Sequence, residues 1–273
     1  MADERLTLAV VSQVFPDRDS WARLPAVLHE VRDLGAALAV LPELPLNPWS
    51  PASRHARDDD AEEVDGPRQE ILSAAAADAG VAVLGGAIIR DPDTGVRHNT
   101  ALLYDRSGSC LARYKKVHLP EEEGFWETSH FEPGREPPTV ISGLPLKIGM
   151  QVCSDVNRTT GFQLLGALGA ELVLAPRCTP SETYERWKLV LRANAVTSGC
   201  YVVSSNRPAT GSGDLIGGPS LVIGPDAEVL VSFSEPVDRS SVDEQTVRLL
   251  QGSSAVDVDR AFAHDDFQVR VTP

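Results

Sequence analysis

Cysteine, basic residues and long apolar runs are all scarce in this chain, and each shortage excludes a class of protein. Only four of the 273 residues are cysteine, and no two of them form a C-x-x-C pair, so neither a zinc motif nor a dithiol redox motif is expected. No apolar run reaches membrane-spanning length, and the charged residues 1–5 do not resemble a signal peptide. We therefore expect a protein of the reducing cytoplasm, whose thiols stay free.

Positive charge is also in short supply. The chain has 25 Lys and Arg against 39 Asp and Glu, which gives a formal net charge of −14. Nucleic acids and anionic membranes bind basic patches, so neither is an expected partner. The densest acidic run, at 58–63, has its carboxylates side by side rather than at ligand spacing. We interpret it as a solvated loop and predict no metal site.

Strand and helix patterns alternate near both ends of the chain, whereas strand hairpins fill the middle. This order indicates a layered α/β protein whose sheets are covered by helices. No repeat or linker divides the chain, so we predict one domain over residues 1–273, with a core of about 6–233 and a C-terminal tail of about 234–273. The irregular stretch 117–137 is unusually long for a loop without a function. Strands are predicted at 6–14, 38–42, 81–89, 99–104, 110–115, 146–152, 171–175, 201–205, 219–224 and 228–233, and helices at 19–34, 66–79, 161–168, 183–197 and 242–250.

Cys153 is the most informative single residue. It ends the apolar run 148–152, which is typical of a buried strand, and the polar residues Ser154 and Asp155 follow at once. A side chain at such a strand end lies where a cleft can form. Cys153 is therefore a candidate nucleophile, provided that a neighbouring group ionises its thiol. The alternative is that Cys153 is a small residue of the core.

Three other segments supply the groups that a thiol nucleophile needs. Glu43 and Lys116 each follow a predicted strand, and Glu127 lies in the long irregular stretch. Glu43 can move the proton, while Lys116 and the backbone N–H of Ser154 can hold an oxyanion. Glu127 can keep Lys116 charged and in place. Taken singly, each of the three is also consistent with an ordinary surface or strand-edge residue.

A set of motifs surrounds these residues in a specific order. The motifs are L-P-E at 41–43, Y-K-K-V-H-L at 114–119, F-W-E-T-S-H-F-E-P-G at 125–134, G-M-Q-V-C-S-D at 149–155, G-A-E-L-V-L-A-P at 169–176, R-A-N-A-V-T-S-G-C-Y-V-V-S-S-N-R at 192–207 and G-G-P-S at 217–220. Together they resemble the nitrilase superfamily of carbon–nitrogen hydrolases. The resemblance extends over roughly residues 6–233, which is nearly the whole chain.

The resemblance implies a role for each of the four residues. Cys153 matches the family's nucleophile, Glu43 its general base and Lys116 the residue that stabilises the transition state. Glu127 matches a second glutamate that positions the lysine. Lys116 is the match, and Lys115 is not, because the family pattern is lysine, any residue, histidine.

The resemblance also implies a fold and an assembly. Members of the family form a four-layer α-β-β-α sandwich of the nitrilase type. They assemble as homodimers or larger homo-oligomers, with sheets extended across the interface. They act on small-molecule substrates without a cofactor.

The substrate is less well defined than the chemistry. The motifs around Lys116 and Glu127 are similar to those of N-carbamoylputrescine amidases and N-carbamoyl-amino-acid hydrolases. The latter hold a carboxylate with arginines at the positions of Val156 and Asn157, and neither residue is basic here. An amino-acid carboxylate is therefore less favoured. The candidates for substrate contact, each of which also suits a structural role, are His118, Phe125, Trp126, Ser154, Asn157, Arg158, Arg177 and Cys178.

These observations predict a cysteine-dependent hydrolase of a non-peptide C–N bond in a small amide or N-carbamoyl compound. The reaction would pass through a thioester-type acyl- or carbamoyl-enzyme and release ammonia or an amine. A nitrilase that converts a nitrile to an acid and ammonia is an alternative, because it uses the same four residues. An alternative of another class is a catalytically silent binding or scaffold protein that has kept the fold.

Overall fold

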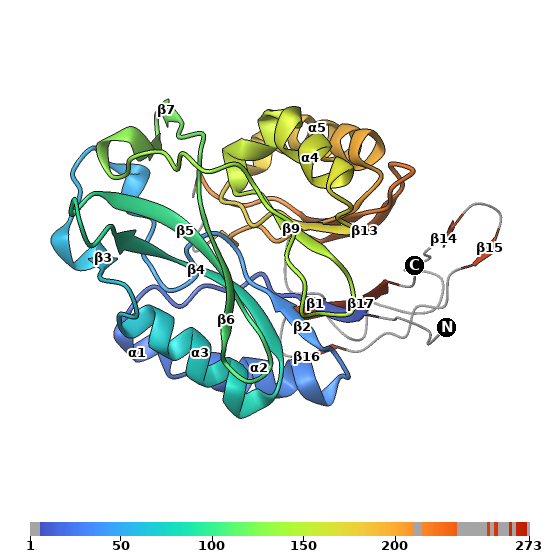
Figure 1. Ribbon diagram of the computed structural model, residues 1–273, viewed down its shortest axis with the longest axis horizontal. Coiled ribbons are helices and arrows are strands. Elements are labelled where there is room, and N and C mark those ends of the chain that lie inside the picture. The colour runs from blue at the N-terminus through green and yellow to red at the C-terminus, as the bar shows by residue number, and fades with distance from the viewer. Residues whose placement is uncertain are drawn as a thin grey trace.

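Two β-sheets face each other, and each carries helices on its outer face, so the molecule has four layers (Figure 1). The computed structural model describes residues 6–209 and 215–233, together with strand residues 250–251, 254–255, 262–263 and 266–271. The first sheet has the strand order β16-β17-β1-β2-β4-β5-β6, with β3 beside β4, and α1, α2 and α3 cover it. The second has the order β13-β12-β11-β10-β9, and α4 and α5 cover it. The predicted α-β-β-α sandwich is confirmed.

The elements have the following bounds. The first sheet consists of β1 (Leu6–Val10), β2 (Leu38–Val40), β3 (Ala61–Glu62), β4 (Ala82–Arg90), β5 (Arg97–Tyr104), β6 (Cys110–Lys115), β16 (Phe262–Ala263) and β17 (Asp266–Val271). The second consists of β9 (Ile148–Met150), β10 (Leu172–Leu174), β11 (Tyr201–Ser204), β12 (Ser220–Ile223) and β13 (Val229–Phe233). The helices are α1 (Arg18–Trp21), α2 (Leu24–Asp33), α3 (Pro67–Ala79), α4 (Thr159–Ala167) and α5 (Tyr184–Ser198). Two short pairs lie outside both sheets, β7 (Glu121–Glu122) with β8 (Phe125–Trp126), and β14 (Leu250–Gln251) with β15 (Ser254–Ala255).

The apolar side chains form one core between the sheets and one under each helical layer. Leu84 of β4 and Leu172 of β10, both 0 % exposed, belong to the core that the two sheets share. Leu28 of α2 packs in the core beneath the first sheet's helices. Leu191 of α5 packs in the matching core of the second sheet. The sheets are therefore buried on both faces, as the continuous apolar runs of the sequence require.

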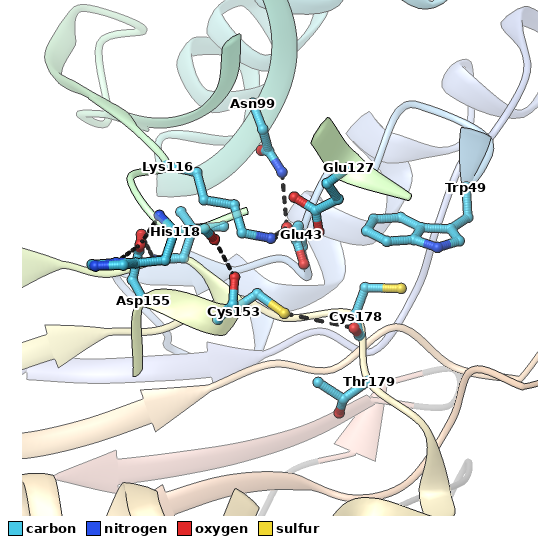
Figure 2. A network of polar contacts seen from close by, with 12 residues as sticks. Glu43, Trp49, Asn99, Lys116, His118, Glu127, Cys153, Asp155, Cys178 and Thr179 are labelled. Carbon is cyan, nitrogen blue, oxygen red and sulfur yellow. Dashed lines mark hydrogen bonds and ion pairs between the residues drawn. The ribbon is translucent and has the colours of Figure 1, made fainter. Parts of the chain in front are cut away.

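Parallel pairing brings several strand ends to one region. β1, β2 and β4 are parallel, and β6 runs in the same direction because β5 is antiparallel to both β4 and β6. In the second sheet β9, β10 and β11 are parallel. The chain therefore leaves β2 towards Glu43 and β6 towards Lys116 at one edge of the first sheet. It leaves β9 towards Cys153 in the facing sheet (Figure 2).

Proline and glycine set the helix boundaries. α3 begins at Pro67, where a missing N–H costs nothing, and ends at Ala79, just before Gly80, which has a φ of +69°. The single helix predicted over 19–34 is wrong, because the structure has two helices, α1 and α2, in this range. Pro25 lies in the first turn of α2, where it has no N–H to donate to the carbonyl of Trp21 and its ring would crowd that carbonyl.

The acidic run at 58–63 is only partly solvated. Asp60 and Glu62 are buried, so the prediction of a wholly solvated loop is wrong for these two residues. Glu62 accepts hydrogen bonds from the backbone N–H groups of Arg68 and Gln69 in the first turn of α3, and its carboxylate pairs with the Arg68 guanidinium at 3.3 Å. A helix N-terminus and a buried cation thus compensate its charge. Within the described residues, no cluster of His, Cys, Asp and Glu has the arrangement of a metal site.

Part of the predicted C-terminal tail belongs to the first sheet. β17 pairs antiparallel with β1, with Leu6 opposite Val271. The sequence pattern does not predict this strand. The helix predicted at 242–250 lies outside the described residues except for Leu250, which is in β14. None of the helices in the described part of the chain is long and apolar enough to cross a membrane.

Candidate active site

Four buried side chains from separate segments meet between the two sheets (Figure 2). Glu43 lies just after β2, and Lys116 follows β6 directly. Cys153 opens a 3₁₀ turn that follows β9, and Glu127 opens another after β8. The sequence placed these four residues at strand ends or in the long loop, and the fold brings them together.

Lys116 connects the two carboxylates of the cluster. Its Nζ lies 2.8 Å from Oε1 of Glu43 and 2.6 Å from Oε1 of Glu127, and all three side chains are 0 % exposed. The side-chain amide of Asn99 also donates to Oε1 of Glu43, at 2.8 Å. Oε2 of Glu43 and Oε2 of Glu127 are buried and accept no hydrogen bond within the described residues. One oxygen of Glu43 is therefore fixed and the other is free to accept a proton.

The charges of this cluster perturb one another. Burial lowers the pKa of Lys116, but Glu127, Glu43 and Cys153 outweigh that effect and raise it well above its ordinary value. Burial raises the pKa of Glu127 to about 8, against the opposing effect of Lys116. Two carboxylates that share one ammonium in a dry site are not easily ionised together.

Cys153 has a strained backbone and a protonated thiol. Its φ is +47°, in the left-handed region that is costly for any residue except glycine. Its N–H donates to Pro176 O at 2.9 Å, and its Sγ lies 3.6 Å from the carbonyl oxygen of Cys178. Burial and the neighbouring Glu43 carboxylate raise the pKa of the thiol well above its ordinary value, whereas Lys116 lowers it. The thiol at rest therefore needs a base to become a nucleophile.

Asp155 connects the nucleophile turn to the segment that carries Lys116. It is fully buried and accepts hydrogen bonds from Tyr114 Oη at 3.0 Å, Val152 N at 3.2 Å, and both the N and Nδ1 of His118, at 2.7 and 2.8 Å. Tyr114 and His118 flank Lys116 in the sequence, whereas Val152 and Asp155 itself flank Cys153. Asp155 therefore holds the turn that carries Cys153 against the segment that carries Lys116.

These residues can perform acyl transfer from nitrogen to sulfur and then to water. A thiol lies beside a base with a free oxygen, and a fixed ammonium provides the donor that a developing oxyanion needs.

Comparison with known proteins identifies the family. The family model for carbon-nitrogen hydrolases matches residues 11–240. The chain belongs to the carbon-nitrogen hydrolase family. This match confirms the predicted membership in the nitrilase superfamily, and the similar proteins place the chain in its amidase-like branch.

The similar proteins are amidases or share the fold. The chain is 28% identical over 256 residues to an omega-amidase, NIT2-B, from Xenopus laevis, covering 90% of each chain. A carbon-nitrogen hydrolase structure from Helicobacter pylori has a TM-score of 0.77 at 22% identity, covering 84% of this chain and 86% of the other, which shows the shared fold. A mutant of the amidase from Nesterenkonia sp. AN1 carries the acetamide moiety of fluoroacetamide on its active-site cysteine. That structure has a TM-score of 0.71 at 26% identity, covering 84% of this chain and 86% of the other. These relatives support cysteine-dependent amide hydrolysis by this family member.

Four of the predicted substrate contacts lie in the two segments that flank the cluster. His118 is half-buried and bonded to Asp155. Ser154 donates its hydroxyl to the carbonyl of His118. Phe125 is buried against the ring of Trp49, with 5.7 Å between the centroids, and the Arg54 guanidinium covers the ring of Trp126 at 3.6 Å. Contact of these residues with substrate stays a prediction.

The other four predicted contacts differ in burial. Asn157 is half-buried and Arg158 is exposed. Arg177 is buried, and its guanidinium donates to Ser204 Oγ at 2.8 Å, to Thr179 Oγ1 and to the carbonyl of Pro219. Burial lowers the pKa of Arg177 to about 10. Cys178 is buried, and its carbonyl faces the thiol of Cys153.

Sequence reasoning missed three residues of the site. Asn99 orients Glu43, Trp49 packs beside Phe125, and Arg207 binds the backbone of the turn that carries Glu43. A polar Asn at the start of the apolar strand 99–104 was a signal for a buried polar contact. Arg207 ends the motif at 192–207, but the motif did not indicate its contact with the Glu43 turn, and Trp49 gave no local signal.

Proposed function

We propose that the chain is an amidase that hydrolyses the C–N bond of a small amide or N-carbamoyl compound. The observation that carries the proposal is a buried cluster in which Lys116 binds both Glu43 and Glu127. Oε2 of Glu43 has no hydrogen-bond partner among the described residues, and the Cys153 thiol lies beside the cluster. A relative named as an omega-amidase, and an amidase structure with an active-site cysteine, support the same chemistry.

The first half of the reaction forms a thioester. Oε2 of Glu43 takes the proton of the Cys153 thiol, and the sulfur attacks the carbonyl carbon. Lys116 Nζ and the backbone N–H of Ser154 stabilise the oxyanion. Glu43 then gives its proton to the leaving nitrogen, the C–N bond breaks, and ammonia or an amine leaves. The acyl or carbamoyl group remains on the sulfur.

The second half regenerates the thiol. Glu43, again a carboxylate, takes a proton from water, and the hydroxide attacks the thioester carbon. The C–S bond breaks, the acid or carbamate is released, and Cys153 recovers its proton from Glu43. Glu127 acts through Lys116 by accepting a hydrogen bond that holds the ammonium in place beside Glu43.

The cations near the site are engaged by protein groups. Lys116 is bound by two carboxylates, Arg177 by hydroxyl and carbonyl oxygens, and Arg207 by three carbonyls. Arg158 is exposed. Within the described residues, no cation of the cluster is left over for a substrate carboxylate, which favours a neutral amide or ureido group as the reacting end.

Replacement of the thiol tests the proposal. Cys153→Ala should lower ammonia release from a panel of simple amides, N-carbamoyl-β-alanine and propionitrile by at least about 10³-fold, because the covalent step is lost. Cys200→Ala, which removes a buried thiol that bonds Ala170 O instead, is the matched control and should retain activity. Turnover by purified Cys153→Ala at the wild-type rate would contradict the proposal.

The panel also separates the alternatives. An amidase releases ammonia from the amide faster than from the nitrile, whereas a nitrilase shows the opposite order. A silent scaffold protein shows neither activity, and its Cys153 reacts with iodoacetamide no faster than Cys200.

A further inference from the structure

Arg207 joins the second sheet to the turn that carries Glu43. It lies three residues beyond the end of β11, and its side chain reaches the segment after β2 in the first sheet. Its Nη1 donates to Glu43 O at 3.0 Å and to Leu44 O at 2.7 Å, and its Nη2 donates to Asn47 O at 3.1 Å. One buried guanidinium thus binds three carbonyls that precede it by at least 160 positions.

The turn it binds has a strained backbone, and Arg207 donates to three of its carbonyls. Leu44 has a φ of +47°, which is costly for a branched side chain. Leu44 is also anchored by apolar contact with Ile88 and Phe131. The carbonyls of Glu43, Leu44 and Asn47 all accept from the same guanidinium. Without Arg207, each of these carbonyls would lose a hydrogen bond. The planar guanidinium has five N–H groups and suits this geometry, whereas an ammonium is a single point.

Arg207 has no carboxylate partner at ion-pair distance among the described residues, so a salt bridge does not explain why its charge is buried. A buried charge is costly unless it is well bonded. Here the backbone of the Glu43 turn supplies the bonds. The side chain of Glu43 is held by Lys116 and Asn99, and its peptide group is held by Arg207. The base is therefore fixed at both ends.

We propose that Arg207 is the positioning residue for Glu43, which sets the base at the correct distance from the nucleophile across the two sheets. The inference rests on the proposed function, because it takes Glu43 as the base. β2 and β9 belong to different sheets, so the separation of Glu43 from Cys153 depends on how those sheets are joined. Arg207 joins them at the carbonyl of Glu43 itself.

Arg207→Lys tests the proposal because it keeps the charge and removes the three-carbonyl geometry. We expect kcat for the amide that the wild type hydrolyses best to fall by about 10- to 100-fold, with KM changed by less than about three-fold. The rate constant for alkylation of Cys153 by iodoacetamide should fall in parallel. This readout needs no bound substrate and depends on removal of the thiol proton.

Arg68→Lys is the matched control. Arg68 is also buried and donates to Leu46 O at 3.2 Å, in the same loop, but does not bond the peptide groups of Glu43 or Leu44. We expect Arg68→Lys to lower the thermal midpoint and to leave kcat within about three-fold of the wild type. Arg207→Gln, which keeps two N–H donors without a charge, serves as a second variant in case lysine prevents folding.

The outcomes separate the two proposals. A folded Arg207→Lys or Arg207→Gln protein with kcat and alkylation rate within three-fold of the wild type would overturn the positioning role. An equal loss of kcat in Arg68→Lys would also overturn it, since loop stability alone would then account for the effect. Wild-type rates in Glu43→Gln would instead overturn the proposed function, whatever Arg207 does.

Discussion

At the scale of single residues, the cluster contains more acid than base. One ammonium, that of Lys116, lies between two buried carboxyl groups, those of Glu43 and Glu127. Both glutamates have one oxygen without a partner in the described structure. The raised pKa of Glu127, which burial causes, means that this carboxyl keeps a proton at neutral pH. The proposed base, Glu43, is the acid of the pair that accepts hydrogen bonds from both Lys116 and Asn99.

The raised pKa of Glu127 makes stability depend on pH. Its pKa is about 8 in the folded protein, against an ordinary value of 4.5. Between these values the folded state holds a proton that the unfolded state has lost, so the free energy of unfolding decreases as pH rises. Glu127→Gln removes this loss. The thermal midpoint of Glu127→Gln minus that of the wild type should therefore be larger at pH 8 than at pH 5, by at least about 4 °C.

Differential scanning fluorimetry at several pH values provides the measurement. Glu132→Gln, at an exposed position, is the control and should show a constant difference from the wild type. A midpoint difference for Glu127→Gln that stays constant or decreases over this pH range would show that Glu127 ionises normally.

The sequence indicated the four cluster residues because each lies in a recognisable motif at a strand end or loop. Asn99 and Arg207 were not found, since their roles depend on contacts with Glu43 that span 56 and 164 positions. The three carbonyls that Arg207 binds have no signature in the sequence. Hydrogen bonds to the backbone are therefore the part of this site that motifs do not reveal.

At the scale of elements, α4 packs unusually close to its neighbours. A Cβ on Gly149 of β9 would lie 2.6 Å from Cδ1 of Leu165 in α4. A Cβ on Gly166 of α4 would overlap the carbonyl oxygen of Ser198 at the end of α5. The Leu165 side chain can shift, but the Ser198 backbone cannot, so it is glycine at position 166 that lets α4 and α5 approach so closely.

Gly166→Ala should therefore destabilise the protein despite the better helix propensity of alanine. The added methyl group meets a backbone carbonyl that cannot rotate away, so we expect a loss of about 1–3 kcal/mol. Urea denaturation followed by circular dichroism gives the value. Gln163→Ala, at an exposed position of the same helix, should change the stability by less than about 0.5 kcal/mol. An unchanged urea midpoint for Gly166→Ala would show that α4 can shift.

Most elements were predictable from periodicity, and the exceptions have physical causes. β6 and α3 match their predicted ranges closely because turns and a terminal glycine bound them. The strand predicted at 6–14 ends at Val10, since Val11 and Val14 extend the apolar pattern past the last ladder pair into a loop that is half-buried at 12–14. β17 was missed because its stability comes from pairing with β1, which lies at the other end of the chain.

At the scale of the whole molecule, the two sheets share one core. Leu84 and Leu172 belong to the same cluster although they come from different sheets. Neither sheet, with its own helices, can bury its inner face without the other sheet. Unfolding should therefore be a single cooperative transition.

Leu84→Ala and Leu172→Ala test this cooperativity. Each should lower the free energy of unfolding by about 2–5 kcal/mol. In both variants the fluorescence of Trp21, in the first helical layer, and of Trp187, in the second, should report the same urea midpoint when each is the sole tryptophan. Leu189→Ala, at a side chain that is 66% exposed, is the control and should have little effect. Separate midpoints for the two tryptophans would contradict a shared core.

The reach of Arg207 across 164 positions has a consequence for synthesis on the ribosome. Residues are added in order, so Glu43, Lys116, Glu127 and Cys153 are all made before the guanidinium that we propose positions the base. A nascent chain thus carries every reactive group while its base is still unplaced. The order of synthesis therefore delays activity. The Cys153 thiol has no positioned base until the second sheet, with Arg207, has been synthesised.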